Sequence, residues 1–207
     1  MAILSILIVI ASVILHEVAH GYVADKLGDG TARYSGRLTL NPLPHIDPIG
    51  SIIVPGFLAL THSPFLIGWA KPVPYNPYNL RNQRWGEALV AGAGPATNIL
   101  LALVCGLAIR LGFGTGSQEV LLFLVTAVYT NLILSLYNLI PLPPLDGSKV
   151  LRSLLPLRGR LAFGAFERGI YATGPFGLLL ISLVAISFLW PLLSGLVQTL
   201  FILITGS

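Results

Sequence analysis

The sequence contains little charge. Only 10% of its 207 residues are Asp, Glu, Lys or Arg, whereas 55% are hydrophobic and the mean hydropathy is +0.83. Soluble domains carry about 25% charged residues, so this composition excludes an ordinary soluble protein and predicts an integral membrane protein. The net charge of +4 does not indicate nucleic-acid binding, because the basic residues fall in loops between apolar runs, where they set membrane orientation.

Cysteine is nearly absent as well. The single Cys105 lies in an apolar stretch and cannot form an internal disulfide, so we interpret it as a small core residue. The features of a cleaved signal peptide are also missing, since no basic residue precedes the apolar residues 2–15 and no small-x-small site follows them. We therefore predict a retained membrane helix at residues 2–24.

Long apolar runs, by contrast, are present. Three of them predict membrane-spanning helices, at about residues 2–24, 87–111 and 119–140. A fourth apolar run, at about 176–205, exceeds one crossing of ~30 Å and is divided by Trp190-Pro191. It predicts a C-terminal helical region, either one long kinked helix or a crossing followed by an interfacial helix. The basic residues 148–175 predict an amphipathic surface segment.

The stretch between the first two predicted spans is irregular. Residues 25–50 are broken by glycine and proline, and the alternation at residues 37–40 predicts a short strand. Residues 49–70 are apolar, but Pro55-Gly56 and His62-Ser63-Pro64 interrupt them. The residues alone leave open a kinked spanning helix or a re-entrant segment.

The most informative motif is His-Glu-x-x-His at residues 16–20. On a helix, His16 and His20 lie on one face, so both imidazoles can reach one metal ion. Glu17 stands between them, where its carboxylate can accept a proton from a bound water. The motif also occurs by chance in proteins that bind no metal. Inside an apolar membrane helix, however, three ionisable groups in five residues are costly without a metal or a polar partner.

A catalytic zinc ion needs a third protein ligand and an open position for water. Besides Glu17, the acidic candidates are few: Asp25, Asp29, Asp47, Glu87, Glu119, Asp146 and Glu167. His45 and Asp47 are more simply a loop histidine and a turn aspartate. Asp146 stands out because three prolines in residues 141–144 hold its carboxylate rigidly after a helix, although the same pattern is typical of a helix stop with an Asp-Gly turn.

Chain topology also bears on Asp146. The two histidines lie near the C-terminal end of the first helix, and Asp146 follows the C-terminal end of the 119–140 helix. These ends meet only if residues 49–70 are re-entrant rather than a crossing, which predicts a re-entrant or hairpin segment over about residues 37–70. The positive-inside rule favours this arrangement, since it divides the twelve Lys and Arg residues eleven to one, with only Arg110 opposite, whereas a crossing divides them eight to four. We therefore expect the metal toward the cytoplasmic face.

Several motifs carry a resemblance to a known family. They are H-E-V-A-H (16–20), G-P-A-T-N (94–98), N-L-I-P-L-P-P-L-D-G (138–147), G-R-L-T-L-N-P-L-P-H-I-D-P-I-G (36–50) and G-W-A-K-P-V-P (68–74). Together they resemble the site-2 protease family of intramembrane zinc metalloproteases, in its compact prokaryotic branch without a PDZ or nucleotide-sensing (CBS) domain. The resemblance runs from residue 16 to about residue 150.

The resemblance implies a complete set of site residues. It implies that His16, His20 and Asp146 bind one Zn²⁺ per chain and that Glu17 is the catalytic base. It further implies that Asn98 and Asn138 orient the substrate strand or stabilise an oxyanion.

The same resemblance implies a function. We expect an intramembrane zinc endopeptidase that hydrolyses peptide bonds in or near transmembrane segments, in regulated intramembrane proteolysis. Its partners would be a membrane-protein substrate and the lipid bilayer. The sequence offers no room for an appended soluble domain, so we expect one membrane-embedded metalloprotease domain over residues 1–207, multi-pass in the cell membrane.

Two other functions are compatible with the histidines. A metal transporter needs ligands on both sides of the membrane, whereas the polar residues here cluster toward one side. A catalytically inactive protein that sequesters membrane segments would have little reason to keep Glu17.

Overall fold

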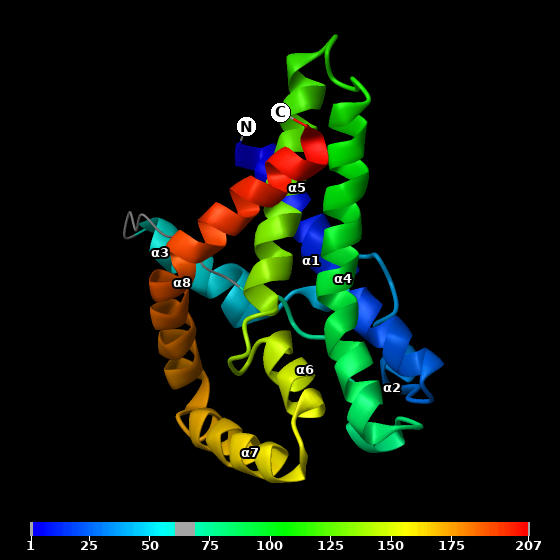
Figure 1. Cartoon of the computed structure of the whole chain (residues 1–207), viewed down its shortest axis with the longest axis vertical. Coiled ribbons are helices and arrows are strands. Elements are labelled where there is room, and N and C mark those ends of the chain that lie inside the picture. The colour runs from blue at the N-terminus through cyan, green and yellow to red at the C-terminus, as the bar shows by residue number, and fades with distance from the viewer. Residues whose placement is uncertain (1, 61–68, 207) are drawn as a thin grey trace.

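The protein is built from helices (Figure 1). The computed structural model describes residues 2–60 and 69–206. The α-helices are α1 (Ala2–Lys26), α2 (Thr31–Tyr34), α3 (Val54–Leu60), α4 (Gln83–Arg110), α5 (Gln118–Asn138), α6 (Asp146–Leu154), α7 (Leu157–Tyr171) and α8 (Gly174–Thr205). Three short turns of other helix types are η1 (Leu43–His45), η2 (Pro48–Ile53) and η3 (Pro77–Asn79).

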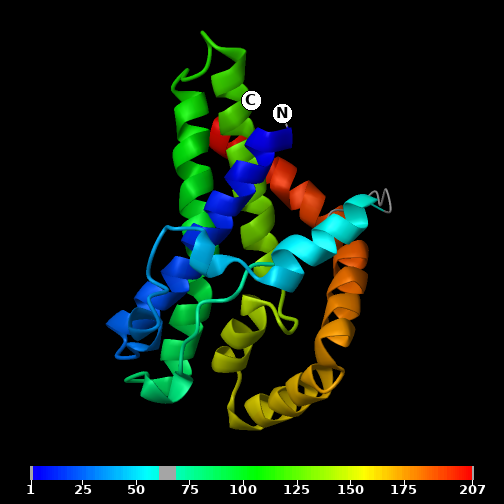
Figure 2. The ribbon, with the colours of Figure 1, turned by 180° about the vertical axis from the view of Figure 1, so that it is seen from behind.

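Four of these helices, α1, α4, α5 and α8, are long and apolar enough to cross a membrane. The predicted α-helical polytopic membrane protein is therefore confirmed. Figures 1 and 2 show that α1 and α5 run in one direction and α4 in the other. Both termini and the α4–α5 turn lie at one end of the molecule, and α2, α6 and α7 lie at the other.

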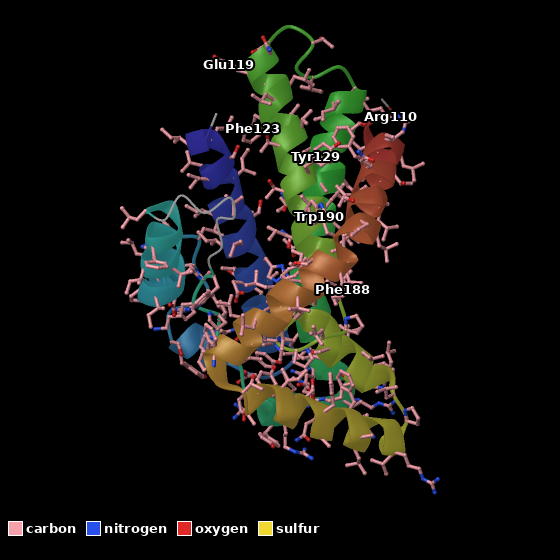
Figure 3. The ribbon with its side chains drawn as sticks, turned by 90° about the vertical axis from the view of Figure 1, so that its left-hand side faces the viewer. Arg110, Glu119, Phe123, Tyr129, Phe188 and Trp190 are labelled. Carbon is pink, nitrogen blue, oxygen red and sulfur yellow. The ribbon has the colours of Figure 1, made fainter. Side chains whose placement is uncertain are left out.

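Small residues let the long helices pack closely. Ala102 of α4 lies in a buried cluster with Val128 and Leu132 of α5 and with Val197 of α8. At Gly106 a Cβ atom would lie 2.3 Å from the side chain of Ile204, so only glycine lets α4 and α8 approach this closely. Tyr129 of α5 is labelled in Figure 3, and it stacks on Phe201 of α8 with ring centroids 4.5 Å apart.

The C-terminal region is one continuous helix. Helix α8 runs from Gly174 to Thr205 with Pro191 inside it. Figures 1 and 2 show that the helix bends along its length, and Figure 3 labels Phe188 and Trp190 just before the proline. Proline removes a backbone hydrogen bond and crowds the preceding turn, which kinks a helix without ending it. Of the two alternatives for this region, the structure has the long kinked helix.

The connection between α1 and α4 contains no strand in its described residues, so the short strand predicted at residues 37–40 is wrong. The reason is the Arg37 side chain, which donates hydrogen bonds to the backbone carbonyls of Pro44, Lys71 and Pro72. The backbones of two loops are thus joined by a guanidinium group instead of a ladder of backbone hydrogen bonds.

The apolar stretch after residue 47 forms a short helical unit. Asp47 caps it by accepting hydrogen bonds from the backbone N–H groups of Ile49 and Gly50. The turn η2 and helix α3 together extend over residues 48–60, about 20 Å of helix, which is less than the ~30 Å that a crossing requires. The predicted interruption at residues 62–64 lies outside the described residues.

Candidate metal centre

Two histidines from α1 and one aspartate from α6 meet at the junction of the helices. The ligand atoms of His16, His20 and Asp146 all lie within 4.8 Å of one another. The Nε2 atoms of His16 and His20 lie 3.1 Å and 3.2 Å from Asp146 Oδ2. All three residues are at most 8% exposed. The structure therefore brings together groups that are 130 residues apart in the sequence.

This donor set fits zinc. Imidazole nitrogens and a carboxylate oxygen are common zinc ligands, at bond lengths of about 2.0–2.2 Å. Tetrahedral ligands at these lengths lie about 3.3 Å from one another. The observed separations of 3.1 Å and 3.2 Å between imidazole nitrogens and the Asp146 carboxylate are close to this value. The zinc-binding role of these residues stays a prediction.

The Nδ1 atom of each imidazole forms a hydrogen bond with a residue of helix α4. His20 Nδ1 donates a hydrogen bond to the backbone carbonyl of Val90 at 2.6 Å, and His16 Nδ1 lies 2.6 Å from Asn98 Oδ1. A carbonyl oxygen only accepts, so each Nδ1 carries the proton and each Nε2 presents its lone pair toward Asp146. Hydrogen bonds of this kind fix the tautomer of metal-binding histidines.

Helix α4 can approach the histidines because it carries glycine there. A Cβ atom on Gly94 would lie 2.5 Å from the Nε2 atoms of both His16 and His20. Gly94 therefore lies directly against the predicted metal ligands. The next residue, Pro95, is itself buried within α4.

Asp146 is held at the start of α6. Gly147 has to be glycine, because a Cβ atom there would lie 2.2 Å from the backbone oxygen of Leu139. Farther along α6, Arg152 forms ion pairs with Glu87 of α4 and Glu167 of α7. Burial alone would raise the pKa of the Asp146 carboxyl, but the two neighbouring imidazoles outweigh burial and keep the pKa below its usual value. The helix start thus presents a carboxylate.

Glu17 faces the same site but is held by the backbone. Its Oε2 atom accepts a hydrogen bond from the backbone N–H of Val73 at 2.8 Å. The residues just before Val73 are fixed in turn by Arg37, which donates to the carbonyls of Lys71 and Pro72 at 2.9 Å and 3.1 Å. One carboxylate oxygen is therefore anchored to an ordered loop.

A pocket of about 360 Å³ opens on this cluster. Its lining includes His16, Glu17, His20, Asn138, Asp146 and Lys149. Asn138 Nδ2 donates to the backbone carbonyl of Leu134 at 2.9 Å, which uses one of its two amide hydrogens. Asn98 does not line the pocket and is fully buried behind His16. The two asparagines that the sequence predicts for substrate therefore lie in different places.

Lys149 is the only lysine or arginine in the described lining of the pocket. Its Nζ atom lies 5.3 Å from the centroid of the Tyr75 ring, and within residues 2–60 and 69–206 it forms no ion pair. Burial alone would lower the pKa of this amine, but the neighbouring Tyr75 and Asp146 outweigh burial and raise the pKa. Lys149 therefore carries its positive charge at neutral pH.

The other candidate ligands have different partners. Asp29 is fully buried and accepts hydrogen bonds from Thr31, the backbone N–H of Asn76 and the Asn79 side chain. Burial alone would raise its pKa, but these hydrogen bonds outweigh burial and lower it. Asp25 forms an ion pair with Arg33, and Glu87 and Glu167 both form ion pairs with Arg152. The His45 ring forms a hydrogen bond with the backbone carbonyl of Thr39.

Comparison with known proteins places the chain in a family. It is 36% identical over 202 residues to "Putative zinc metalloprotease YwhC" of Bacillus subtilis, an alignment that covers 92% of this chain and 85% of that protein. The chain belongs to peptidase family M50. Residues 114–181 also match the sequence profile of this family, which is the family of the site-2 proteases. The resemblance of the sequence motifs to this family is thereby confirmed, and the chain is a metalloprotease.

Further M50 relatives match a smaller part of their own length. "Putative zinc metalloprotease Rip2" of Mycolicibacterium smegmatis is 32% identical over 140 residues, which are 66% of this chain and 51% of that protein. The protein of the same name from Mycobacterium tuberculosis strain Erdman is 30% identical over 138 residues, which are 67% and 52% of the two chains. No solved structure gives a significant match. These relatives are named zinc metalloproteases, which points to zinc as the metal. The family and the four long apolar helices together support a multi-pass membrane protein.

Proposed function

We propose that this M50 chain is an intramembrane zinc endopeptidase that hydrolyses peptide bonds in or near transmembrane segments of membrane proteins. The observation that carries the proposal is the convergence of His16, His20 and Asp146 beside Glu17 in one pocket. We further propose one zinc ion per chain, a single membrane-embedded domain over residues 1–207, and a place in regulated intramembrane proteolysis.

Each residue of the pocket has a separate role in the proposed hydrolysis. His16, His20 and Asp146 would hold the metal. When bound, zinc acidifies a water molecule and polarises a carbonyl oxygen. Glu17 accepts a proton from the attacking water at the carboxylate oxygen that Val73 leaves free, and later passes it to the leaving amine. The substrate helix has to unwind locally first, because its amides are bonded internally.

Two side chains in the pocket are suited to the carbonyl oxygen of the substrate. Asn138 keeps one amide hydrogen for this oxygen, and Lys149 supplies an ammonium group without an ion-pair partner in the described residues. Donors aimed at the oxygen stabilise the negative charge that develops during attack. For Asn98, whose amide contacts His16 and other buried groups, we propose no contact with substrate.

We also propose that the pocket lies toward the cytoplasmic face. The support is the distribution of charge along the chain. Eleven of the twelve Lys and Arg residues lie between the end of α1 and the start of α4, or in α6 and α7, whereas Arg110 is the last residue of α4. Figure 3 labels Arg110 at the end of the molecule that carries the α4–α5 turn, near Glu119. Cytoplasmic segments are enriched in basic residues.

The proposal is tested by metal dependence. The purified full chain in detergent should cleave a reporter that contains a single transmembrane helix with central glycine and proline residues, which weaken the helix. A zinc chelator should stop cleavage and added zinc should restore it. Cleavage that continues without metal, or that remains absent with zinc and this reporter in both detergent and vesicles, would contradict the proposal.

Asp146→Asn should weaken zinc binding by about 100-fold or more, because an anionic ligand becomes a neutral amide of the same shape. The measurement is the zinc content and zinc affinity of the purified variant beside the wild type. Asp47→Asn is a suitable control, since Asp47 caps η2 and has no place among the three predicted ligands. Equal affinity in Asp146→Asn and the wild type would remove Asp146 from the ligand set.

Lys149→Met should lower kcat by about 10- to 100-fold and leave KM and zinc content nearly unchanged, because the ammonium group acts on charge that develops only during attack. Lys149→Arg should recover part of the rate. Arg158→Met is the matched control, because it removes a positive charge at an exposed position of α7 outside the pocket. It should leave kcat unchanged. A rise in KM with unchanged kcat would instead give Lys149 a role in substrate binding.

A further inference from the structure

A series of buried hydrogen bonds leads from the metal centre into the helical core. His16 Nδ1 lies 2.6 Å from Asn98 Oδ1, and Asn98 Nδ2 donates to Asn131 Oδ1 at 2.8 Å. Asn131 Nδ2 donates to Ser12 Oγ at 3.0 Å and to the backbone carbonyl of Ala127 at 2.9 Å. Ser12, Asn98 and Asn131 are at most 4% exposed. The series joins α1, α4 and α5.

The direction of these hydrogen bonds is set at the end farthest from the metal centre. The carbonyl of Ala127 only accepts, so it takes the amide nitrogen of Asn131 and turns the Asn131 oxygen toward Asn98. Asn98 must then present its nitrogen to Asn131 and its oxygen to His16. As a result His16 carries its proton on Nδ1, and its Nε2 faces Asp146.

We propose that Asn131 is a positioning residue for the metal centre and acts on His16 through Asn98. The inference rests on the proposed function, because it takes His16 to be a zinc ligand. Without Asn131, the Asn98 amide loses its 2.8 Å hydrogen bond and keeps only the longer one, at 3.4 Å, from its Nδ2 to the backbone carbonyl of Ser12. The orientation that turns the Asn98 oxygen toward His16 is then held less firmly. Partners of this kind around metal ligands typically change metal affinity by about 10- to 100-fold when removed.

A purely structural role predicts something else. Hydrogen bonds between membrane helices contribute to their association, so the same groups would stabilise the bundle of α1, α4 and α5 without acting on His16. In that case a change at Asn131 lowers stability, but the folded protein binds zinc as the wild type does. Metal affinity and the electronic spectrum of the bound metal therefore separate the two roles.

The test uses Asn131→Leu, which keeps the side-chain volume and removes the amide. Zinc affinity of the full chain in detergent is measured by competition with a chromophoric chelator, and the cobalt-loaded protein is examined by visible absorption. We expect about tenfold weaker zinc binding and a shifted cobalt spectrum. In the Asn98→Ala background the same change at Asn131 should have almost no further effect, because the link to His16 is already broken.

Ser135→Ala provides the matched control. Ser135 lies on α5 one turn after Asn131, is fully buried, and its Oγ has no hydrogen-bond partner in the part of the chain that the structure describes. Its removal should leave zinc affinity and the cobalt spectrum unchanged. If Asn131→Leu does not fold, Asn131→Ala takes its place, and thermal unfolding of the metal-free proteins measures the structural contribution separately.

Two results would overturn the inference. The first is that the Asn131→Leu variant binds zinc with wild-type affinity and shows an unchanged cobalt spectrum. Asn131 would then have a structural role only. Full additivity with Asn98→Ala would show that Asn131 does not act through Asn98. These results differ from the result expected if the proposed function is wrong. In that case the wild type would not bind zinc, or a change at His16 would not weaken zinc binding.

Discussion

Glu17→Gln should abolish peptide-bond hydrolysis while the protein keeps its zinc. Glutamine has the shape of glutamate, and its side-chain oxygen can still accept the hydrogen bond that Val73 N–H donates to Glu17 at 2.8 Å. The loop and the pocket therefore stay as they are, and only the negative charge is lost. Because an amide does not accept a proton from water, we expect hydrolysis to fall by about 10²- to 10⁴-fold. Cleavage of the membrane reporter and zinc content are measured on the same preparation.

The matched control is Glu119→Gln. Glu119 is exposed at the start of α5, and Figure 3 labels it at the end of the molecule that carries the α4–α5 turn. This variant loses the same charge and should cleave the reporter at the wild-type rate. If Glu17→Gln retained the wild-type rate, another group would be the base. If it lost zinc as well, Glu17 would belong to the ligand set rather than beside it.

Gly94→Ala should eliminate the metal centre. The added Cβ would lie 2.5 Å from the Nε2 atoms of His16 and His20, a distance that real Cβ atoms essentially never show. The imidazoles have little room to yield, because their Nδ1 atoms are held by Asn98 and by the carbonyl of Val90. We expect zinc affinity to fall by more than about 100-fold and cleavage to be lost with it. Zinc titration and the cleavage assay measure both losses.

Gly92→Ala is the control within the same helix. A Cβ atom on Gly92 would meet nothing within 4 Å, so the added methyl group projects into open space. Alanine favours helix by up to about 1 kcal/mol over glycine, so this variant should be at least as stable as the wild type and should bind zinc equally. Equal zinc binding by Gly94→Ala and Gly92→Ala would mean that α4 does not approach the histidines as described.

The local part of the site is readable from the sequence because helix geometry fixes it. Residues four apart on a helix share a face, and this alone predicts that His16 and His20 point in one direction. The meeting with Asp146 needs the topology of the whole chain. The sequence predicts this meeting for two reasons. A membrane segment either crosses the bilayer or does not, and the re-entrant topology divides the positive charges eleven to one. Such constraints make a contact 130 residues apart predictable.

The remaining features depend on contacts that no local pattern encodes. The alternation at residues 37–40 suggested a strand, but Arg37 takes up the neighbouring carbonyls with its side chain. Asn131 appears in the sequence as one polar residue in an apolar helix, and only packing brings it to Asn98. A polar residue at membrane depth indicates that it has a hydrogen-bond partner, but the sequence does not show which residue that partner is. Lys149, three residues after Asp146 on the same helix face, could have been found by helix geometry.

The burial pattern of α1 has a consequence for how the chain tolerates substitution. Every fourth residue from residue 8 to residue 24 is buried, and the series is Ile8, Ser12, His16, His20 and Ala24. The opposite side exposes Ile3, Ile6, Leu7 and Ile10, whose exposed fractions range from 43% to 76%. The helix therefore cannot rotate about its own axis without drawing Ser12 and both histidines into lipid. Apolar residues on the outer side should exchange freely with one another, whereas the inner line should accept almost no change, so mutational tolerance along α1 should rise and fall with the helical turn.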